Sequence, residues 1–524
     1  MKFAALTWQL PVPLGRDNRN DSISDASLQS THLSFPLFIM PHAVFGIDEL
    51  LRLVIDEIVE TSPSTAVSFA LTCRSFEEPT LRSLWKLQDS LITLVKVLPD
   101  HTWVRWDTLV SGRDFPVYCV RHRSTQAIEY DPSAKDWLRL QRYASWMREL
   151  SLACDWYTTA GTLRRLSSHS PDGILCPKLE RLDWDIGQMD SVLPFFHLFL
   201  SRHLKEVTLH TSVYLSHAPS GLSAALVQII PFLSTSLEAV HFKCHHAKDK
   251  PLTDAISSFI CRCGSPLRSL GTWLPLSEVA TRHIVQLPNL RSWAVAHGPP
   301  QTVPTSIFPS LEQLQINEPA AMPWLHLLAS HKKGVLQNGS ASATSYANIR
   351  ERLKSISFPG STIVDPTLLS SIVTFRNLVA LCVGGYCPDE GCVLRLTDDD
   401  MENLAAALPR LETLKLGEPC YFNSCSNTVA SLLSISIYCL DLTILETHFN
   451  TGTITSDMQR LLDRGAGRDK AKCKLSELIT GYFPNELPGE DIETVMMGFK
   501  AIFPHLEIAG SDGRSFKVEC GPRD

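Results

Sequence analysis

The chain has 524 residues, of which 44% are hydrophobic and 20% charged, and its formal net charge is −7. A chain of this length exceeds a single hydrophobic core, so several units or one extended repeat array are expected. The ordinary composition excludes wholesale disorder, and the absence of a Lys- or Arg-rich arm argues against a nucleic-acid partner.

No apolar run reaches the roughly 18–20 residues of a membrane span, so we expect no membrane partner. The longest candidate, 428–440, is shorter and contains several serines. The run 3–10 follows Lys2 and resembles a secretory signal, but Trp8 and Gln9 interrupt it and no small-residue cleavage site follows. The 15 cysteines are odd in number and scattered, which indicates reduced thiols and a cytoplasmic or nuclear protein.

Residues 1–40 are rich in Asp, Asn, Ser and Pro and lack sustained periodicity. We expect a flexible leader there. Met40 directly precedes the patterned sequence, so whether residues 1–39 belong to the mature chain stays open.

Within 41–90, the segment 44–86 predicts three short helices. Apolar side chains recur at spacings of three and four from Ile47 to Ile58, a turn follows at 61–65, and a second apolar run begins at Ala66. A unit of about 40 residues seldom has a robust core of its own. A helical cap for the sequence that follows is therefore one interpretation.

The same segment resembles the F-box motif, especially as it occurs in basidiomycete fungi. The resemblance rests on 47–51, on Ile55 and Ile58, on 70–76 with its Cys-Arg-x-aromatic element, and on the Leu-Trp pair at 84–85. The family usually has Pro where Asp48 stands and Trp where Phe76 stands. The resemblance implies that the segment binds a Skp-type adaptor and, through that adaptor, a cullin. The apolar side chains that would contact the adaptor or hold the helices together are Ile47, Leu50, Leu51, Ile55, Leu71, Phe76 and Trp85.

Residues 91–146 are predicted to be a helical connecting region. It contains Trp103, Trp106, Trp137 and Trp146. Aromatic side chains this dense are costly to expose, so we expect them to pack the helical motif against the sequence that follows. A base-stacking surface is the alternative, but it lacks interleaved positive charge.

From 147 to 524 the pattern Leu-x-x-Leu-x-Leu, or one close to it, recurs. Residues 4 and 6 of a copy share one face of a short strand and, with residue 1, point into the core. One copy cannot bury this face alone, so neighbours stack into a curved solenoid. Clear copies cover 179–184, 204–209, 237–242, 290–295, 311–316, 353–358, 378–383 and 411–416, and weaker ones begin near Met147, Leu267, Leu442, Leu475 and Leu506.

Helices are expected between the strands, at 277–287 and after Thr397, the expected N-cap. The copies are irregularly spaced, and the longest gap contains a Gly-, Ser- and Ala-rich segment near 332–345 that predicts a mobile insertion. The predicted fold is therefore α/β, with a short three-helix F-box followed by an irregular leucine-rich-repeat solenoid. It resembles the divergent repeat arrays found behind fungal F-box motifs.

Three groups contain residue types that bind metals. They are Cys244, His245 and His246 with Cys261 and Cys263; Cys382, Cys387 and Cys392; and Asp398, Asp399 and Asp400. The first two lack the regular pair spacing of zinc sites, and we interpret them as core or loop thiols. The acidic group fits a solvated first helical turn. No full phosphate-loop, nucleophile-elbow or zinc-protease motif occurs, so we expect no metal, no cofactor and no enzyme activity.

The resemblance implies the substrate-recognition subunit of a Skp–cullin–F-box ubiquitin ligase, whose repeats hold an unknown target protein. We expect that target on the strand face, where positions 3 and 5 of each copy point away from the core. The partner-binding candidates at these positions are Asp183, Thr208, His241, Gln313, Gln315 and Lys415, and two more, Asp185 and His210, lie just beyond their copies. Three alternatives stay open: capture by the insertion near 332–345, a repeat scaffold without adaptor binding, and a hydrolase with a hidden site.

Overall fold

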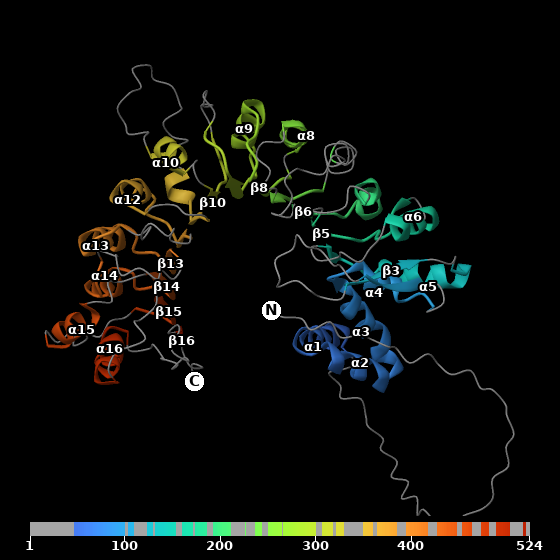
Figure 1. Cartoon of the computed structure of the whole chain (residues 1–524), viewed down its shortest axis with the longest axis horizontal. Helices are drawn as coiled ribbons and strands as arrows, with labels where there is room; N and C mark the ends of the chain where they lie inside the picture. Colours follow the sequence, from blue (N-terminus) through green and yellow to red (C-terminus); the bar gives the residue numbers. More distant parts are fainter. Residues whose placement is uncertain are drawn as a thin grey trace, which may run out of the picture.

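The computed structural model describes residues 47–99, 103–108, 123–128, 132–152, 160–170, 173–185, 192–210, 226, 236–243, 250–264, 266–299, 307–317, 321–329, 349–359, 364–384, 395–417, 427–447, 453–463, 473–480, 489–503 and 517–519. These residues form an α/β arch with strands on the inner side and helices on the outer side (Figure 1). The leader 1–40 and the insertion 332–345 lie outside the described residues.

The strands form one 14-stranded sheet that follows the chain almost in order. They are β1 Leu87–Gln88, β4 Glu149–Leu152, β5 Arg181–Asp185, β6 Glu206–His210, β7 Ala239–Lys243, β8 Ser269–Thr272, β9 Ser292–Val295, β10 Gln313–Ile316, β11 Ser355–Phe358, β12 Ala380–Val383, β13 Thr413–Leu416, β14 Ile444–Thr447, β15 Glu477–Thr480 and β16 Lys517–Glu519. All neighbours in this sheet are parallel except β16, which pairs antiparallel with β15.

Each clear copy of the repeat pattern forms a strand, as predicted. Four weaker copies form β4, β8, β14 and β15, and the copy near Leu506 lies outside the described residues. Residues 1, 4 and 6 of every clear copy are buried. Adjacent copies stack in register, so that Leu314 is aligned with Trp293 on one side and Ile356 on the other. Each repeat therefore buries the apolar face of its neighbours, at about 1.5–3 kcal/mol for a fully buried large side chain.

Helices connect successive strands of the sheet. In the repeat region they are α6 Ala160–His169, the 3₁₀ helix η5 Leu193–Phe199, α8 Lys250–Ile260, α9 Glu278–Val285, α10 Ala321–Ala329, α12 Pro366–Ile372, α13 Asp398–Ala407, α14 Ala430–Tyr438, α15 Ile454–Asp463 and α16 Gly489–Ile502. Side-chain caps set several starts: Ser277 accepts from Ala280 N at 3.2 Å, and Thr397 forms a capping box with Asp400. The helix expected within 277–287 and the N-cap at Thr397 are both confirmed.

Three helices precede the sheet: α1 Asp48–Thr61, α2 Pro63–Thr72 and α3 Arg74–Lys86. Ser62 caps α2, and Pro63 occupies its first position, where the missing N–H costs nothing. Strand β1 follows α3 directly and pairs with β4. The three-helix unit is thus joined to the start of the sheet without a linker.

The connecting region is not wholly helical, which corrects the prediction for 91–146. It contains α4 Leu91–Val95, β2 Trp103–Thr108, β3 Arg123–Ile128 and α5 Ala134–Ala144, and β2 and β3 form an antiparallel pair. From Val104 to Thr108, β-branched or aromatic residues alternate with polar ones, which favours a strand over a helix.

Aromatic contacts that include Trp137 and Trp146 join the three-helix unit to the repeats, as predicted, and the side chains of Trp103 and Trp106 lie outside the described part of the structure. The Trp85 ring of α3 lies 4.7 Å from the Tyr143 ring of α5, and Tyr143 meets Trp146 edge-on at 5.2 Å. Trp137 stacks on His169 of α6 at 4.4 Å. These contacts fix the helices against the first repeats, because buried aromatic pairs contribute beyond their buried area.

A largely buried histidine, His297, gives the middle of the arch a pH-dependent stability. Thr281 Oγ1 lies 3.0 Å from His297 Nε2, and the His297 carbonyl accepts from Trp324 Nε1 at 2.6 Å. Burial lowers the pKa of His297 to about 4. The unfolded chain therefore binds a proton that the folded chain excludes. The resulting stability is present above the ordinary histidine pKa and is lost as pH falls toward 4.

We expect the free energy of unfolding to fall by on the order of 2 kcal/mol from pH 7 to pH 4.5 through His297 alone, a figure reduced because the ring is partly accessible. Urea titrations at both pH values measure it for the native chain and for His297→Gln. The variant should lose that part of the pH dependence. An equal dependence in both proteins would contradict this account of His297.

None of the described helices is long and apolar enough to cross a membrane.

Candidate functional site

The three-helix unit exposes several large hydrophobic side chains. Ile47, Leu50, Leu53 and Leu71 expose 48%, 38%, 66% and 73% of their surface. The first three follow one another at a spacing of three across the start of α1, so they lie along one side of that helix. So much exposed apolar surface on one small unit is typical of a protein-binding surface. We call these four residues the apolar helix set.

The structure divides the seven predicted adaptor-binding residues. Ile47, Leu50 and Leu71 are exposed, whereas Leu51, Ile55 and Trp85 are buried. Buried side chains hold the unit together and cannot reach a partner without rearrangement. Their role in the described structure is therefore packing.

Phe76 is half-buried at the start of α3. Its ring stacks on Phe69 of α2, with ring centroids 4.6 Å apart and an angle of 5° between the rings.

Leu53 was missed by the sequence reasoning. It continues the spacing of Ile47 and Leu50 by one further step, so a signal for it was present in the sequence.

Asp48, the position compared with a proline in the predicted F-box resemblance, is the first residue of α1. Proline suits this position because its missing N–H is not needed there. Asp48 and Glu49 suit the same turn for a different reason, since their carboxylates lie at the positive end of the helix dipole. The helix therefore begins at this residue without proline.

The inner face of the sheet brings together five of the eight predicted partner-binding residues. Asp183 Oδ1 on β5 lies 2.7 Å from His210 Nε2 on β6. Thr208 is aligned between Asp183 and His241, and Asp185 is aligned with His210. Thr208 is buried and the other four are half-buried. These residues form one polar cluster across β5, β6 and β7, which we call the β5–β7 cluster.

The other three predicted residues lie farther along the sheet. Gln313 and Gln315 are on β10, and Lys415 is on β13. Lys415 Nζ lies 3.2 Å from Glu446 on β14. The predicted set is thus spread along the arch rather than gathered in one patch.

His241 depends on a glycine in the next strand. A Cβ on Gly271 would lie 2.6 Å from His241 Nδ1, so only glycine leaves room for the imidazole in this position. Ser269 Oγ lies 3.4 Å from His241 Nε2. Burial lowers the pKa of His241 below its ordinary value, which keeps the ring neutral at pH 7.

Small side chains line the inner face of the sheet between the β5–β7 cluster and Lys415. They are Ser269, Gly271, Ser292, Ala294, Ser355, Ser357, Ala380 and Cys382. Small side chains let the backbone of another molecule approach a sheet closely. The sequence reasoning did not single them out, although each occupies position 3 or 5 of its repeat.

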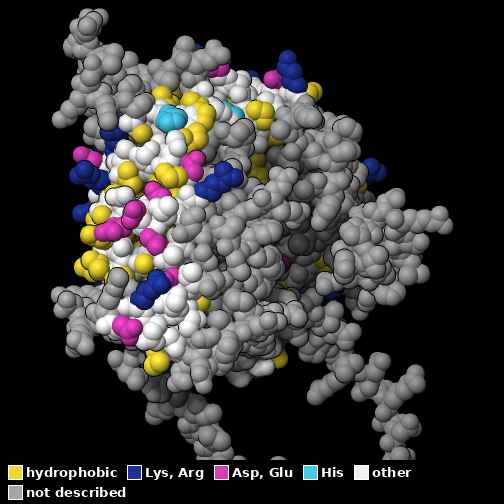
Figure 2. Space-filling model, turned by 60° about the vertical axis from the view of Figure 1, so that its left-hand side comes forward, with side chains coloured by type: hydrophobic (Ala, Val, Ile, Leu, Met, Phe, Trp, Pro, Cys, Tyr) yellow, Lys and Arg dark blue, Asp and Glu magenta, His cyan; other side chains and the backbone are white. Residues whose placement is uncertain are grey.

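The outer face of the C-terminal repeats has mixed chemistry. Figure 2 shows acidic, basic and hydrophobic side chains interspersed over the described part of this face. A binding surface for nucleic acid needs positive charge gathered along its path. This view therefore gives no support to a nucleic-acid interface.

The thiols and acids considered as metal ligands have other roles where they are described. Burial raises the pKa values of Cys261, Cys263 and Cys382, which disfavours the thiolate that binds a metal. Asp398 accepts hydrogen bonds from Thr428 N and Oγ1 at 2.7 Å. Within the described ranges, no group of three His, Cys, Asp or Glu side chains could hold a metal ion.

The remaining candidate ligands, Cys244, His245, His246, Cys387 and Cys392, lie outside the described residues.

No protein-family model matches the chain, and no curated protein matches it. Among solved structures, the chain is similar to the complex of Rad7 and Elc1 from yeast. The match has 16% sequence identity and a TM-score of 0.33, and covers 77% of this chain and 88% of the other. A likeness of this size does not establish a shared fold or function, so the functional argument rests on the geometry above.

Proposed function

We propose that the chain is the substrate-recognition subunit of a Skp–cullin–F-box ubiquitin ligase. Its F-box would be the three-helix unit, and its leucine-rich-repeat array would be the arch. The observation that supports this most is the apolar helix set, because large apolar side chains exposed together on one small unit are typical of a protein-binding surface. The adaptor would bring a cullin, which the chain itself does not contact.

The arch would hold the target protein. An inner face about 14 strands long offers an extended concave surface, as solenoids do for their partners. The β5–β7 cluster supplies hydrogen-bonding and charged groups, and the small side chains beyond it allow close approach. In this role the protein needs no chemistry of its own, since it accelerates transfer by holding target and catalytic subunits together. A cytoplasmic or nuclear location suits it.

The direct test uses purified full-length chain and a purified Skp-type adaptor from its own organism. We expect a one-to-one complex on gel filtration, with a dissociation constant of about 1 µM or tighter by calorimetry. Absence of binding at about 100 µM adaptor would remove the adaptor role.

A second candidate is a repeat scaffold whose helices serve only as an N-terminal cap. Its specific support is that the three-helix unit is attached closely to the repeats, since β1 pairs with β4 and Trp85 packs on Tyr143. A cap, however, has no use for exposed leucines. The adaptor-binding experiment separates the two candidates.

A further inference from the structure

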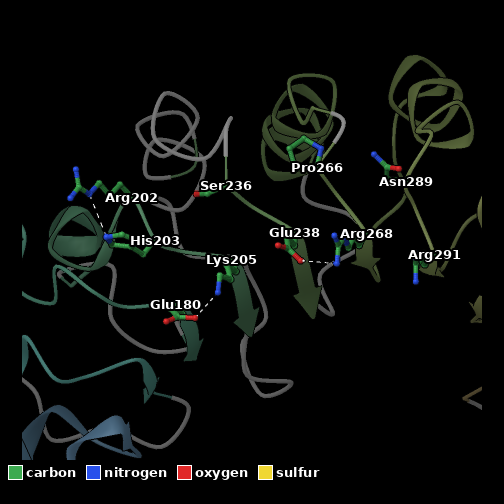
Figure 3. A pocket seen from close by; sticks show the side chains of 10 residues that line it. All are labelled: Glu180, Arg202, His203, Lys205, Ser236, Glu238, Pro266, Arg268, Asn289 and Arg291. Atoms are coloured by element: carbon green, nitrogen blue, oxygen red, sulfur yellow. Dashed lines mark hydrogen bonds and ion pairs between the residues drawn. The ribbon is translucent and has the colours of Figure 1, made fainter. Parts of the chain in front are cut away.

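Charged side chains form a row where successive strands begin. From β4 to β11 the residue just before each strand is, in order, Arg148, Glu180, Lys205, Glu238, Arg268, Arg291, Glu312 and Lys354. Backbone hydrogen bonds join neighbours in this row, as in Arg291 N to Arg268 O at 2.7 Å. Figure 3 shows five members side by side, with Arg202, Ser236, Pro266 and Asn289 on the connections that lead into the strands. We call this the leading-edge row.

The signs alternate along the row, and most neighbours form ion pairs. Lys205 Nζ lies 2.7 Å from Glu180, and Lys354 Nζ lies 2.9 Å from Glu312. The lysines lower the pKa values of both carboxyl groups. The alternation fails once, where Arg268 and Arg291 are adjacent.

The two arginines are poorly neutralised. Arg268 lies 3.4 Å from Glu238, and Arg291 lies 3.9 Å from Glu312, whose carboxylate is closer to Lys354. The next residue along each of these strands is Ala239, Ser269 or Ser292. None of these side chains supplies a charge that could neutralise the arginines. Like charges on adjacent strands are destabilising. An anion seated between the arginines would relieve that repulsion.

The contrast with a neighbouring arginine is clear. Arg181 lies one residue further along β5 and binds two carboxylates, Glu149 at 3.0 Å and Glu206 at 2.9 Å. Arg181 is therefore satisfied within the chain. Among the residues that the structure describes, Arg268 and Arg291 have no equivalent pair of carboxylates.

A groove runs past these residues. A cavity of about 420 Å³ is lined by Arg202, His203, Lys205, Arg268 and Arg291, with Glu180 and Glu238 as its acids. A second cavity of about 1030 Å³ shares Glu180, Lys205, Glu238 and Arg268 with it and extends to α1 and α3. Nine basic side chains line the larger cavity against six acidic ones, although the whole chain is negative. The nine are Arg52, Arg74, Arg82, Lys86, Arg148, Lys178, Arg181, Lys205 and Arg268.

We propose that this groove binds an extended acidic segment of another protein, with a carboxylate seated between Arg268 and Arg291. Guanidinium groups suit this task because their donors match a carboxylate in pairs. The path from β4 to β9 crosses five strand spacings, about 24 Å, which an extended peptide of about seven residues covers. The proposal does not rest on adaptor binding, since it concerns a different surface.

The interspersed acids favour a peptide over nucleic acid. A phosphate backbone carries a negative charge at every step and would meet Glu180, Glu206 and Glu238 along the groove. A peptide can place its acidic side chains opposite arginines and uncharged ones opposite the glutamates. Complementarity of that kind sets specificity more than affinity.

The test measures fluorescence anisotropy of a labelled eight-residue peptide, Glu alternating with Ser, on the full-length chain. We expect binding that weakens steeply with salt. The double variant R268Q/R291Q should reduce affinity at least tenfold. The matched control R376Q/R410Q changes two exposed arginines that precede later strands and do not line the groove, and it should stay within twofold.

A variant that is expected to strengthen peptide binding separates an effect on the groove from unfolding of the chain. Glu238→Gln removes the carboxylate nearest Arg268, so it should tighten peptide binding about threefold or more. The proposal is overturned if a Gln-Ser peptide binds as tightly as the Glu-Ser peptide. It is also overturned if R268Q/R291Q has no effect, or if single-stranded DNA of equal charge binds more tightly than the peptide.

Discussion

Replacing Ile47, Leu50 and Leu71 together with aspartate is expected to weaken binding of a Skp-type adaptor at least a hundredfold, about 3 kcal/mol. These three side chains expose 48%, 38% and 73% of their surface, so each introduced carboxylate can reach water in the unbound chain. They place charge where apolar contact is needed, and a buried unpaired carboxylate is costly. Calorimetry on purified full-length chain measures the loss.

The matched control replaces two exposed apolar residues outside the unit. Leu138 on α5 and Val279 on α9 expose 67% and 65% of their surface. The double variant L138D/V279D should bind the adaptor within twofold of the native chain. If the triple variant also binds normally, the apolar helix set is not the adaptor surface.

Trp293→Ala is expected to lower the free energy of unfolding of the central repeats by about 3–5 kcal/mol. The Trp293 ring meets Trp324 edge-on at 4.8 Å and lies 5.0 Å from Phe308. Phe308 has a φ of 49°, a conformation unfavourable for a bulky residue. The cluster offsets that strain by burying all three rings, so removal of one leaves a cavity and a strained neighbour.

Hydrogen exchange is the suitable measurement, because repeat arrays unfold in parts rather than all at once. Protection should fall most in β8 to β11 and least in β14. Val279→Ala on the exposed side of α9 should change protection little. Uniform loss of protection along the whole sheet in Trp293→Ala would contradict the model of locally coupled repeats.

The strands were predictable because each copy contains its own signal. In 290–295, for example, Leu290, Trp293 and Val295 mark the buried face and the residues between them mark the open one. The start of α13 was predictable for the same reason, since Thr397 and Asp400 form the cap locally. Local patterns of this kind need no knowledge of distant contacts.

The rest depends on residues far apart in the sequence. Nothing near Gly271 indicates that it makes room for His241, which is on the preceding strand. The pairing of β2 with β3 was missed because it joins two separate segments of a region that was predicted to be helical. Likewise, Arg268 and Arg291 become neighbours only when the strands align, so their shared charge is not visible along the chain.

Burial within the three-helix unit also required the structure. Leu50 and Leu51 are adjacent in sequence and similar in chemistry, yet one exposes 38% of its surface and the other 5%. The helical pattern predicts that both residues are apolar but does not divide them between packing and binding. That division identifies the exposed residues that the triple aspartate variant replaces.

Affinity purification with mass spectrometry, using three forms of the full-length chain, tests the central claim that two separate surfaces bind two partners. The native chain should recover a Skp-type adaptor, a cullin and target proteins. The variant I47D/L50D/L71D should lose the adaptor and cullin but keep the targets. Charge reversal at Asp183, Asp185 and Lys415 should lose targets but keep the adaptor. Loss of both partners from either variant, with folding intact, or no adaptor with the native chain, would contradict the account.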